Sequence, residues 1–325
     1  MDLRQLNALV AIAEHGSFSA AADALATVQS NVSTHVKKLE IELGSALVDR
    51  SSGELTEAGV LCVDRARRVI AELDALSSDV TALSYQVTGT VRLGSIGTAA
   101  RWLIPELLNL VPRRHPLLDL VFCESTTLGI DRQLAVGYVD LGVLVLPASG
   151  SEVRSVALFE EDLGLALPAN HPLVTRPFIT FEELAQLPLL LPLAGSNYRD
   201  ELDALATKKG VTLRPRAEMD SLRLVQALTM EGCGYSILPS SAFVHMSDEH
   251  WVLVPVEGLA PRTVGVVQRR RGRPGAPVRA VLEILEEIAS DPDRLPVGVR
   301  PIPIEERTLR GAPPAQRAGH NDAVR

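Results

Sequence analysis

The chain has 325 residues, a formal net charge of −8, 46% hydrophobic residues and 22% charged residues, a composition that indicates a globular protein of two or three domains. No apolar run approaches the roughly 20 residues of a membrane-spanning helix, and the N-terminal segment lacks a signal-peptide pattern, so we expect a cytoplasmic protein without a membrane partner. Three scattered cysteines and seven dispersed histidines favour neither a disulfide framework nor a metal site, and we expect no cofactor.

The N-terminal part predicts three helices and a small hairpin. Apolar residues recur at helical spacing in residues 3–13, a second short helix covers 17–25, and a third covers 28–43 and stops at a glycine. The stretch 45–56 then indicates two short strands around a turn. Three helices followed by a hairpin predict a winged helix-turn-helix domain over residues 1–58.

The third helix has an unusual outer face. Val32, Val36 and Leu39 fall on one side of a helical wheel. The opposite side carries short hydrogen-bonding side chains followed by two lysines. In a major groove, the short side chains would reach base edges and the lysines would meet phosphates, whereas the alternative is a solvated helix face. The outer side comprises Ser30, Asn31, Ser33, Thr34, Lys37 and Lys38, and Arg50 at the base of the wing adds a candidate grip on the DNA backbone.

A long helix follows the hairpin. From Glu57 to about Gln86 the chain has no proline, and apolar residues recur at threes and fours. About thirty such residues exceed an ordinary domain helix and favour pairing with another copy of the chain. The alternative is a core helix of the next domain. We therefore predict a linker and dimerisation helix over 59–87.

The remainder alternates strands and helices to about residue 290. This order predicts a parallel, doubly wound α/β body in two lobes with a cleft between them. The first lobe covers about 88–162 and 265–290, and the second about 163–264. The basic stretch 268–274 is expected to be a solvated loop. Residues 291–325, rich in proline and arginine, are expected to be a disordered tail.

The sequence resembles the LysR-type transcriptional regulators. The specific part of the match is "SFSAAADAL…VQSNVSTHVKKLEIELGSALVDR…LTEAG", and "VRLGSIGTAARWLIPELL" and "LTMEGCGYSILP" match the family more loosely. The resemblance implies a winged helix-turn-helix, a linker helix and a two-lobed, periplasmic-binding-protein-like effector domain. It also implies a homodimer or homotetramer that binds double-stranded DNA, responds to a small-molecule effector and acts on RNA polymerase.

The resemblance places Gln29 and His35 on the reading helix as well. Thr34 and His35 stand where the family often has an arginine-glutamine pair, and the wing lacks a further basic residue that is common there. Residues 1–58 hold eight acids and four bases, so long-range attraction to DNA is weak. We therefore expect few phosphate contacts per subunit and a shallow dependence of affinity on salt.

The expected cleft gathers small polar residues at helix N-termini. Such termini offer free amides and a positive dipole end to an anion, so a carboxylate effector is the hypothesis. The alternative is that each hydroxyl only caps its own helix. The candidate residues are Ser95, Gly97, Thr98, Ser125, Thr126, Thr127, Gly195, Ser196, Asn197 and Ser221.

Two further features of the α/β part are open to more than one interpretation: its cysteines and its cleft. Cys123 and Cys233 are expected to be buried and inert, with redox sensing as the alternative. The two-lobed cleft would also suit an enzyme or a small-molecule binding protein. However, the sequence has no nucleophile elbow, no phosphate-binding loop and no dinucleotide fingerprint. A non-enzymatic regulator is therefore the prediction.

Overall fold

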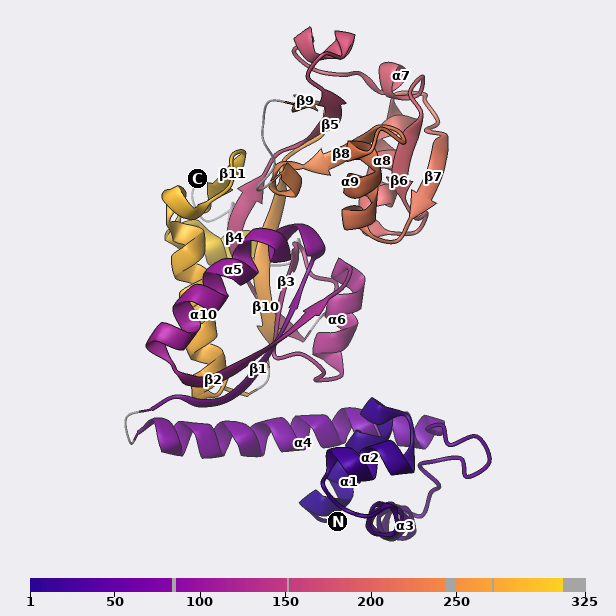
Figure 1. Ribbon diagram of the computed structural model, residues 1–325, viewed down its shortest axis with the longest axis vertical. Helices are drawn as coiled ribbons and strands as arrows, with labels where there is room; N and C mark the ends of the chain where they lie inside the picture. Colours follow the sequence, from indigo (N-terminus) through magenta and orange to yellow (C-terminus); the bar gives the residue numbers. More distant parts are fainter. Residues whose placement is uncertain (84–85, 151, 244–249, 271, 312–325) are drawn as a thin grey trace, which may run out of the picture.

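The computed structural model describes residues 1–83, 86–150, 152–243, 250–270 and 272–311 (Figure 1). The last two residues expected in the long helix before Gln86, and the end of the expected tail from 312 onward, lie outside the described residues. Within the described parts, no helix is long and apolar enough to cross a membrane.

The N-terminal domain contains the three predicted helices and a short hairpin. Its helices are α1 (Leu3–His15), α2 (Phe18–Ala24) and α3 (Gln29–Leu43). Both α1 and α3 end at glycines in the left-handed conformation. The predicted hairpin is present in a minimal form, as an antiparallel bridge between Val48 and Leu55. Asp49 accepts hydrogen bonds from the N–H and hydroxyl of Ser51, and these fold the tip into a turn that leaves little ladder.

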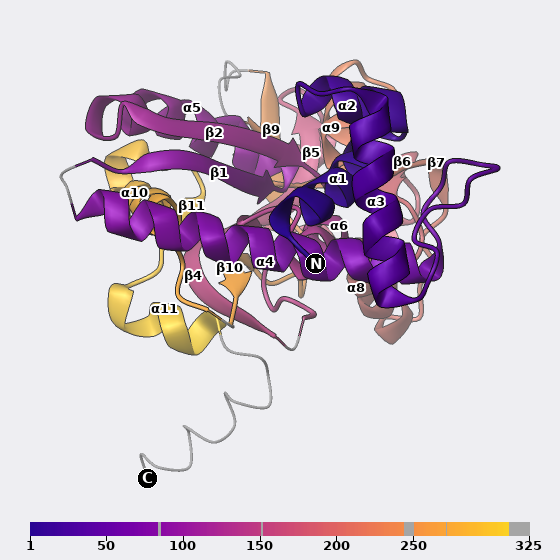
Figure 2. The ribbon, with the colours of Figure 1, turned by 90° about the horizontal axis from the view of Figure 1, so that it is seen from below.

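Helix α4 (Glu57–Ala82) is the predicted long helix, and it begins at the N-cap Thr56. It runs beneath the α/β body, and the N-terminal domain lies at one end of it (Figure 2). Its buried residues Val63 and Ala66 join the core of the N-terminal domain. One continuous helix therefore connects the two halves of the molecule.

The first lobe is built on a six-stranded mixed sheet in the order β11-β4-β10-β3-β1-β2. Strand β1 pairs in parallel with β2 and β3, whereas β10 pairs antiparallel with both β3 and β4, and β11 pairs antiparallel with β4. The expectation of a wholly parallel sheet was therefore wrong, because the chain returns from the second lobe in the opposite direction. The elements are β1 (Thr88–Ser95), α5 (Gly97–Arg114), β2 (Leu117–Glu124), α6 (Thr127–Ala135), β3 (Leu141–Val145), β4 (Val153–Glu161), β10 (Arg262–Arg269) and α10 (Ala276–Ser290).

The second lobe has an antiparallel sheet in the order β8-β5-β9 and a parallel pair, β6-β7. Its largest apolar core gathers leucines from β5, β6 and α8. Strands β7 and β9 were not predicted. The elements are β5 (Leu163–Pro168), α7 (Phe181–Leu184), β6 (Leu189–Pro192), α8 (Asn197–Lys208), β7 (Pro215–Met219), α9 (Leu222–Met230), β8 (Ser236–Pro239) and β9 (Trp251–Pro255), with the short 3-10 helices η1 (Pro172–Thr175) and η2 (Ser240–Phe243).

The basic stretch 268–274 begins inside the sheet. Strand β10 continues through Arg269, and Gln268 is buried. The expectation of a solvated loop was therefore wrong for its first two residues, because their backbone pairs with β4.

Residues 291–311 are ordered, which corrects the expectation of a disordered tail from 291. They form η3 (Pro292–Arg294), β11 (Val299–Pro301) and α11 (Ile304–Gly311). The guanidinium of Arg307 is buried and donates to the carbonyl of Ile302 and to the hydroxyl of Ser290. Strand β11 pairs with the edge strand β4. These contacts offset the conformational entropy that the segment loses when it adopts a fixed structure. Its composition alone indicated that this loss would leave it disordered.

Candidate nucleic-acid interface and inter-lobe cleft

Helix α3 presents the polar face that its sequence predicts. Val32, Val36 and Leu39 are fully buried against α1 and α2. The candidates on the opposite face are exposed, and among the described residues Lys37 and Lys38 have no ion pair. A free ammonium group on an exposed helix is available to a phosphate. The exposed candidates are Gln29, Ser30, Asn31, Thr34, Lys37 and Lys38.

Two of these side chains are held by local hydrogen bonds. The Thr34 hydroxyl donates to the carbonyl of Ser30 at 2.7 Å, and the Asn31 amide donates to the hydroxyl of Thr27 at 3.0 Å. Each side chain keeps further hydrogen-bonding capacity, because a hydroxyl still accepts and an amide has a second N–H and an oxygen. These hydrogen bonds therefore fix the orientation of both side chains before DNA binds.

Arg50 and Ser33 belong to a structural cluster as well as to the candidate interface. The Arg50 guanidinium donates to Glu40 at 2.9 Å and to the Ser33 hydroxyl at 3.4 Å, and it stacks over the Phe18 ring at 5.0 Å. Glu40 also accepts the backbone N–H groups of Leu47 and Val48. Burial by itself raises the pKa of Glu40, but the hydrogen bonds from these donors outweigh burial, and the pKa is lowered. Glu40 therefore fastens the hairpin to α3 and positions Arg50.

His35 does not lie with the other candidates. It is half-buried, and its charge helps to lower the pKa of Asp2, whose main cause is the hydrogen bond from the N–H of Gln5. Asp2 caps α1. His35 therefore lies near enough to Asp2, the cap of α1, to act on its pKa.

A buried ion pair that the sequence did not reveal lies where the two lobes join. Glu161, at the end of β4, is fully buried and accepts from the Arg262 Nε at 2.6 Å. Arg262 Nη2 also donates to the Thr98 hydroxyl at 2.8 Å, and Ser241 donates to the other carboxylate oxygen. The sequence predicted Thr98 here and missed the other three. Burial raises the pKa of the neighbouring Tyr198, whose hydroxyl donates to Ile237.

The mouth of the cleft is bridged by a second ion pair. Arg223, at the start of α9 in the second lobe, pairs with Glu124, at the end of β2 in the first lobe, at 2.5 Å. A Cβ on Gly97 would come within 2.6 Å of the Glu124 carboxylate and 2.9 Å of the Arg223 side chain. The predicted residue Gly97 is therefore the place where both lobes meet the first turn of α5.

The other predicted cleft residues divide between caps and open positions. Thr126 and Ser196 each accept an N–H of their own helix, as the capping alternative expected. Ser95 is buried, and its carbonyl accepts the N–H of Ser125. The Ser221 side chain makes no cap hydrogen bond. The last three predicted residues differ in their burial. Thr127 is half-buried, while Gly195 and Asn197 are exposed.

The linker helix is fastened to the first lobe at two points. Asp79 accepts from the N–H of Ala276, the first residue of α10, at 2.9 Å and from Arg279 at 3.1 Å. Three turns earlier, Arg68 donates to the carbonyl of Ala135, the last residue of α6, at 2.8 Å. Each contact satisfies a helix end that lacks its own partner. The DNA-side helix is therefore coupled directly to the α/β body.

The three cysteines are free thiols in different parts of the fold. Cys62 is half-buried in α4 against the N-terminal core, and burial raises its pKa. Cys123, in β2, is half-buried, and Cys233, after α9, is exposed. The expectation that Cys233 is buried was therefore wrong, because it lies in the turn that leads into β8.

Comparison with known proteins identifies both halves of the chain. Residues 3–60 match the model "Bacterial regulatory helix-turn-helix protein, lysR family". Residues 85–290 match the model "LysR substrate binding domain". Together these matches account for the N-terminal domain and the two-lobed body.

The chain is also similar to individual regulators over most of its length. The DNA-binding transcriptional dual regulator OxyR of Escherichia coli is 31% identical over 88% of this chain and 94% of its own, and other relatives are named hydrogen peroxide-inducible genes activators. A full-length cysteine-to-aspartate variant of OxyR from Pseudomonas aeruginosa has a TM-score of 0.73 at 27% identity, covering 93% of this chain and 97% of that one. Full-length CbnR in complex with its target DNA has a TM-score of 0.62 at 25% identity, covering 88% and 99%.

Proposed function

The chain belongs to the LysR family of DNA-binding transcriptional regulators, and we propose that the exposed face of α3 reads the major groove of its operator. The observation that carries this proposal is the division of α3 into a fully buried apolar side and an exposed side with short polar residues and unpaired lysines. Ser30, Asn31 and Thr34 face base edges, while Lys37 and Lys38 meet phosphates.

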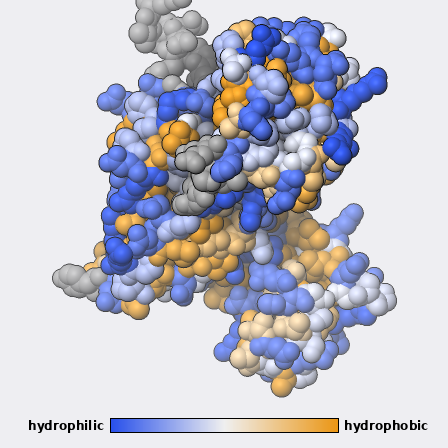
Figure 3. Space-filling model, turned by 45° about the horizontal axis from the view of Figure 1, so that its top comes forward, coloured by the Kyte–Doolittle hydropathy of each residue, from blue (hydrophilic) through white to orange (hydrophobic). Residues whose placement is uncertain are grey.

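The regulator acts as a homodimer or a higher oligomer through α4. Val69, Leu73, Leu76, Val80 and Leu83 are between 40% and 84% exposed and recur at steps of four and three. This heptad spacing suits pairing with the same helix of a second copy. Apolar side chains also gather in the middle of the surface seen in Figure 3, where they interrupt the hydrophilic exterior.

The effector is a small anion that binds non-covalently at the cleft mouth. Arg262 is already neutralised by Glu161, so it does not need a ligand. Arg223 is held only by Glu124, and its side chain is 60% exposed. A carboxylate that displaces Glu124 from Arg223 gains the N-terminal amides of α5 and changes the contact between the lobes.

The DNA-binding proposal predicts that Thr34→Ala/Lys37→Ala abolishes saturable binding to the DNA upstream of the gene. The double variant removes one base-facing hydroxyl and one phosphate contact per subunit. Fluorescence anisotropy with labelled upstream DNA and unlabelled competitors measures it. The matched control is Thr207→Ala/Lys208→Ala on α8, where Thr207 makes the same hydroxyl-to-carbonyl bond four residues back and both side chains are exposed. Equal loss in both variants contradicts the proposal.

The same assay predicts a shallow dependence on salt. Lys37, Lys38 and Arg50 supply about three phosphate contacts per subunit, so a dimer is expected to show a log–log slope of about −5. A slope near −10 would require many contacts that the described residues of this acidic domain do not offer.

Hydrogen peroxide is expected to leave operator affinity unchanged, in contrast to what the names of the relatives suggest. Cys123 and Cys233 lie on different elements, and Cys62 has a raised pKa that disfavours its reactive thiolate. Anisotropy before and after peroxide treatment tests this, with mass spectrometry to locate any oxidation. An affinity change that disappears in Cys233→Ser would show a thiol sensor instead.

A further inference from the structure

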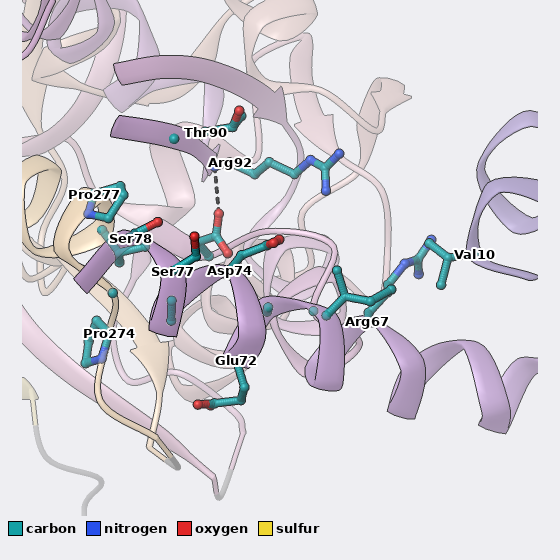
Figure 4. A pocket seen from close by; sticks show the side chains of 18 of the residues that line it. Val10, Arg67, Glu72, Asp74, Ser77, Ser78, Thr90, Arg92, Pro274 and Pro277 are labelled. Atoms are coloured by element: carbon teal, nitrogen blue, oxygen red, sulfur yellow. Dashed lines mark hydrogen bonds between the residues drawn. The ribbon is translucent and has the colours of Figure 1, made fainter. Parts of the chain in front are cut away.

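The groove between α4 and the first lobe is lined by charged residues whose charges are already compensated. The backbone N–H of Arg92 donates to the Asp140 carboxylate at 2.8 Å (Figure 4). Burial raises the pKa of Asp140, and the charges of Arg269 and Arg92 oppose this rise. The groove therefore does not require a ligand. The exposed face of α3 differs from it, because several side chains there keep hydrogen-bonding groups that no described residue satisfies.

Asn31 and Thr34 lie side by side on the exposed face of α3, since residues three apart on a helix are neighbours. Each is held by a hydrogen bond to the preceding turn. The Asn31 Nδ2 donates to the hydroxyl of Thr27 at 3.0 Å, and the Thr34 hydroxyl donates to the carbonyl of Ser30 at 2.7 Å. Both side chains therefore present a defined set of groups to the major groove.

The groups that remain free determine which base each side chain can recognise. Asn31 keeps its amide oxygen and one N–H, so an acceptor and a donor lie next to each other. Adenine offers the complementary pair in the major groove, the N6 amino donor and the N7 acceptor, and asparagine binds this edge through two hydrogen bonds. Thr34 uses its hydroxyl proton for Ser30, so toward DNA it offers an acceptor oxygen and a methyl group. A methyl group suits the C5 methyl of thymine.

The same part of α3 lacks the side chains that recognise guanine best. Guanine presents two acceptors, N7 and O6, and arginine or lysine binds both of them. Residues 29–34 include neither arginine nor lysine. Arg50, which lies nearby, donates to Glu40 at 2.9 Å and to the Ser33 hydroxyl at 3.4 Å. The two lysines of α3 follow a turn later, where contacts to phosphates are expected. The N-terminal half of α3 therefore favours A·T base pairs.

We propose that Asn31 reads an adenine in each operator half-site and that Thr34 contacts the methyl group of a thymine in the neighbouring base pair. Thr27 is a positioning residue: it is half-buried in the turn before α3, and it acts on the adenine only through the Asn31 amide. This inference rests on the proposed reading of the major groove by α3 and names the bases that this face recognises.

The test begins with the selection of binding sites from randomised DNA by the full-length protein. The selected half-site is expected to contain an adenine at a fixed position next to a thymine. Each adenine is then replaced in turn by 7-deazaadenine, in which a C–H group stands in place of N7. At the adenine that Asn31 reads, this replacement is expected to weaken binding at least about fivefold in fluorescence anisotropy, because the amide N–H loses its acceptor.

Asn31→Ala is expected to weaken binding to the unmodified site by at least about tenfold. It is also expected to bind the 7-deazaadenine site as well as the adenine site, because the group that senses N7 is gone. A purely structural role of Asn31 would lower affinity for both sites and leave the difference between them unchanged.

The two threonines are tested by variants that change one group each. Thr27→Val removes the hydroxyl and is expected to reduce the discrimination between adenine and 7-deazaadenine, whereas Thr27→Ser restores it. Thr34→Ser keeps the hydroxyl and removes the methyl group. The wild-type protein is expected to lose about threefold in affinity when the thymine is replaced by deoxyuridine, which lacks the methyl, and Thr34→Ser is expected to bind both sites equally.

The matched control is Asn7→Ala, which changes an exposed asparagine of α1 in the same domain. It is expected to keep both the wild-type affinity and the response to 7-deazaadenine. Wild-type binding that is insensitive to 7-deazaadenine at every selected adenine, or an Asn31→Ala variant that remains as sensitive as the wild type, overturns this inference and leaves the proposed function intact. Failure to select any site overturns the proposed function, and this inference with it.

Discussion

Replacing Arg262 by methionine is expected to destabilise the effector-binding domain by about 3–5 kcal/mol. The change leaves Glu161, which is 0% exposed, with the Ser241 hydroxyl as its remaining side-chain partner among the described residues and without a compensating charge. It also removes the donor that holds the Thr98 hydroxyl at 2.8 Å. Urea unfolding followed by circular dichroism measures the loss.

The double variant Arg262→Met/Glu161→Leu separates the cost of a lone charge from the value of the pair. Removing both charges is expected to recover most of the loss, because a buried ion pair gains little over packed apolar groups. The control is Arg300→Met. Arg300 pairs with Asp162 at 2.7 Å, but both side chains are about half exposed, so about 1 kcal/mol or less is expected. Wild-type stability in Arg262→Met alone would show that Glu161 is not charged in the folded protein.

The ion pair lies where an effector signal has to pass. Glu161 precedes Asp162, at which the chain first crosses between the lobes, and Ser241 follows Ser240, whose N–H donates to the carbonyl of Asp162. Arg262 begins the strand of the return crossing. Thr98 adds the first turn of α5, whose start forms the cleft mouth. Direct contacts therefore link the first turn of α5 to both crossings between the lobes.

The C-terminal segment adds a brace on the other side of these crossings. The carbonyl of Gly298 accepts from the N–H of Asp162 and from the Ser240 hydroxyl. A Cβ at Gly298 would lie 2.7 Å from Ser240, and its φ of 76° also favours glycine. This segment lies beyond the 85–290 match to the family domain. In this chain, hydrogen bonds of that segment therefore support the first crossing between the lobes.

Helices were predictable because their signals are local. Helices α1 and α2 cover the predicted stretches, and α3 ends at the glycine that its sequence indicated. Strand β4 was missed because its sequence, "VRSVALFEE", carries charges at both ends. One of these, Glu161, is buried by pairing with a residue about a hundred positions away. No local pattern reports such a partner.

The candidate site residues also divide into those with a local sequence signal and those that only the fold brings together. The exposed face of α3 was predictable, since a buried apolar side determines which residues point outward. Thr98 was predictable as a residue at a helix start, whereas Arg262 and Glu161 were not, because only the fold brings them together. The influence of His35 on Asp2 was not predictable for a similar reason, because Asp2 caps another helix.

Gly59→Ala is expected to abolish operator binding while leaving the effector domain folded. Gly59 lies in the first turn of α4, where a Cβ would sit 2.0 Å from the carbonyl oxygen of Leu47. That oxygen accepts the N–H of Thr56 and is backbone, so it cannot move aside cheaply. The alanine would gain about 1 kcal/mol in helix propensity, which is much less than the clash costs. The hairpin and α4 must therefore separate.

Separation of the hairpin from α4 breaks the N-terminal core at Leu47 and Val48, on which α3 also packs. The exposed polar face of α3 then loses its fixed orientation. Anisotropy with the upstream DNA measures the loss of binding, and thermal unfolding reports whether the transition of the effector domain is unchanged. The control is Gly210→Ala in the second lobe: a Cβ there meets nothing within 4 Å, and although its φ of 73° strains an alanine, the strain lies away from the N-terminal domain, so normal operator binding is expected. Normal operator binding by Gly59→Ala would mean that the hairpin does not need to pack on α4 for DNA recognition, since the glycine was the condition for that contact.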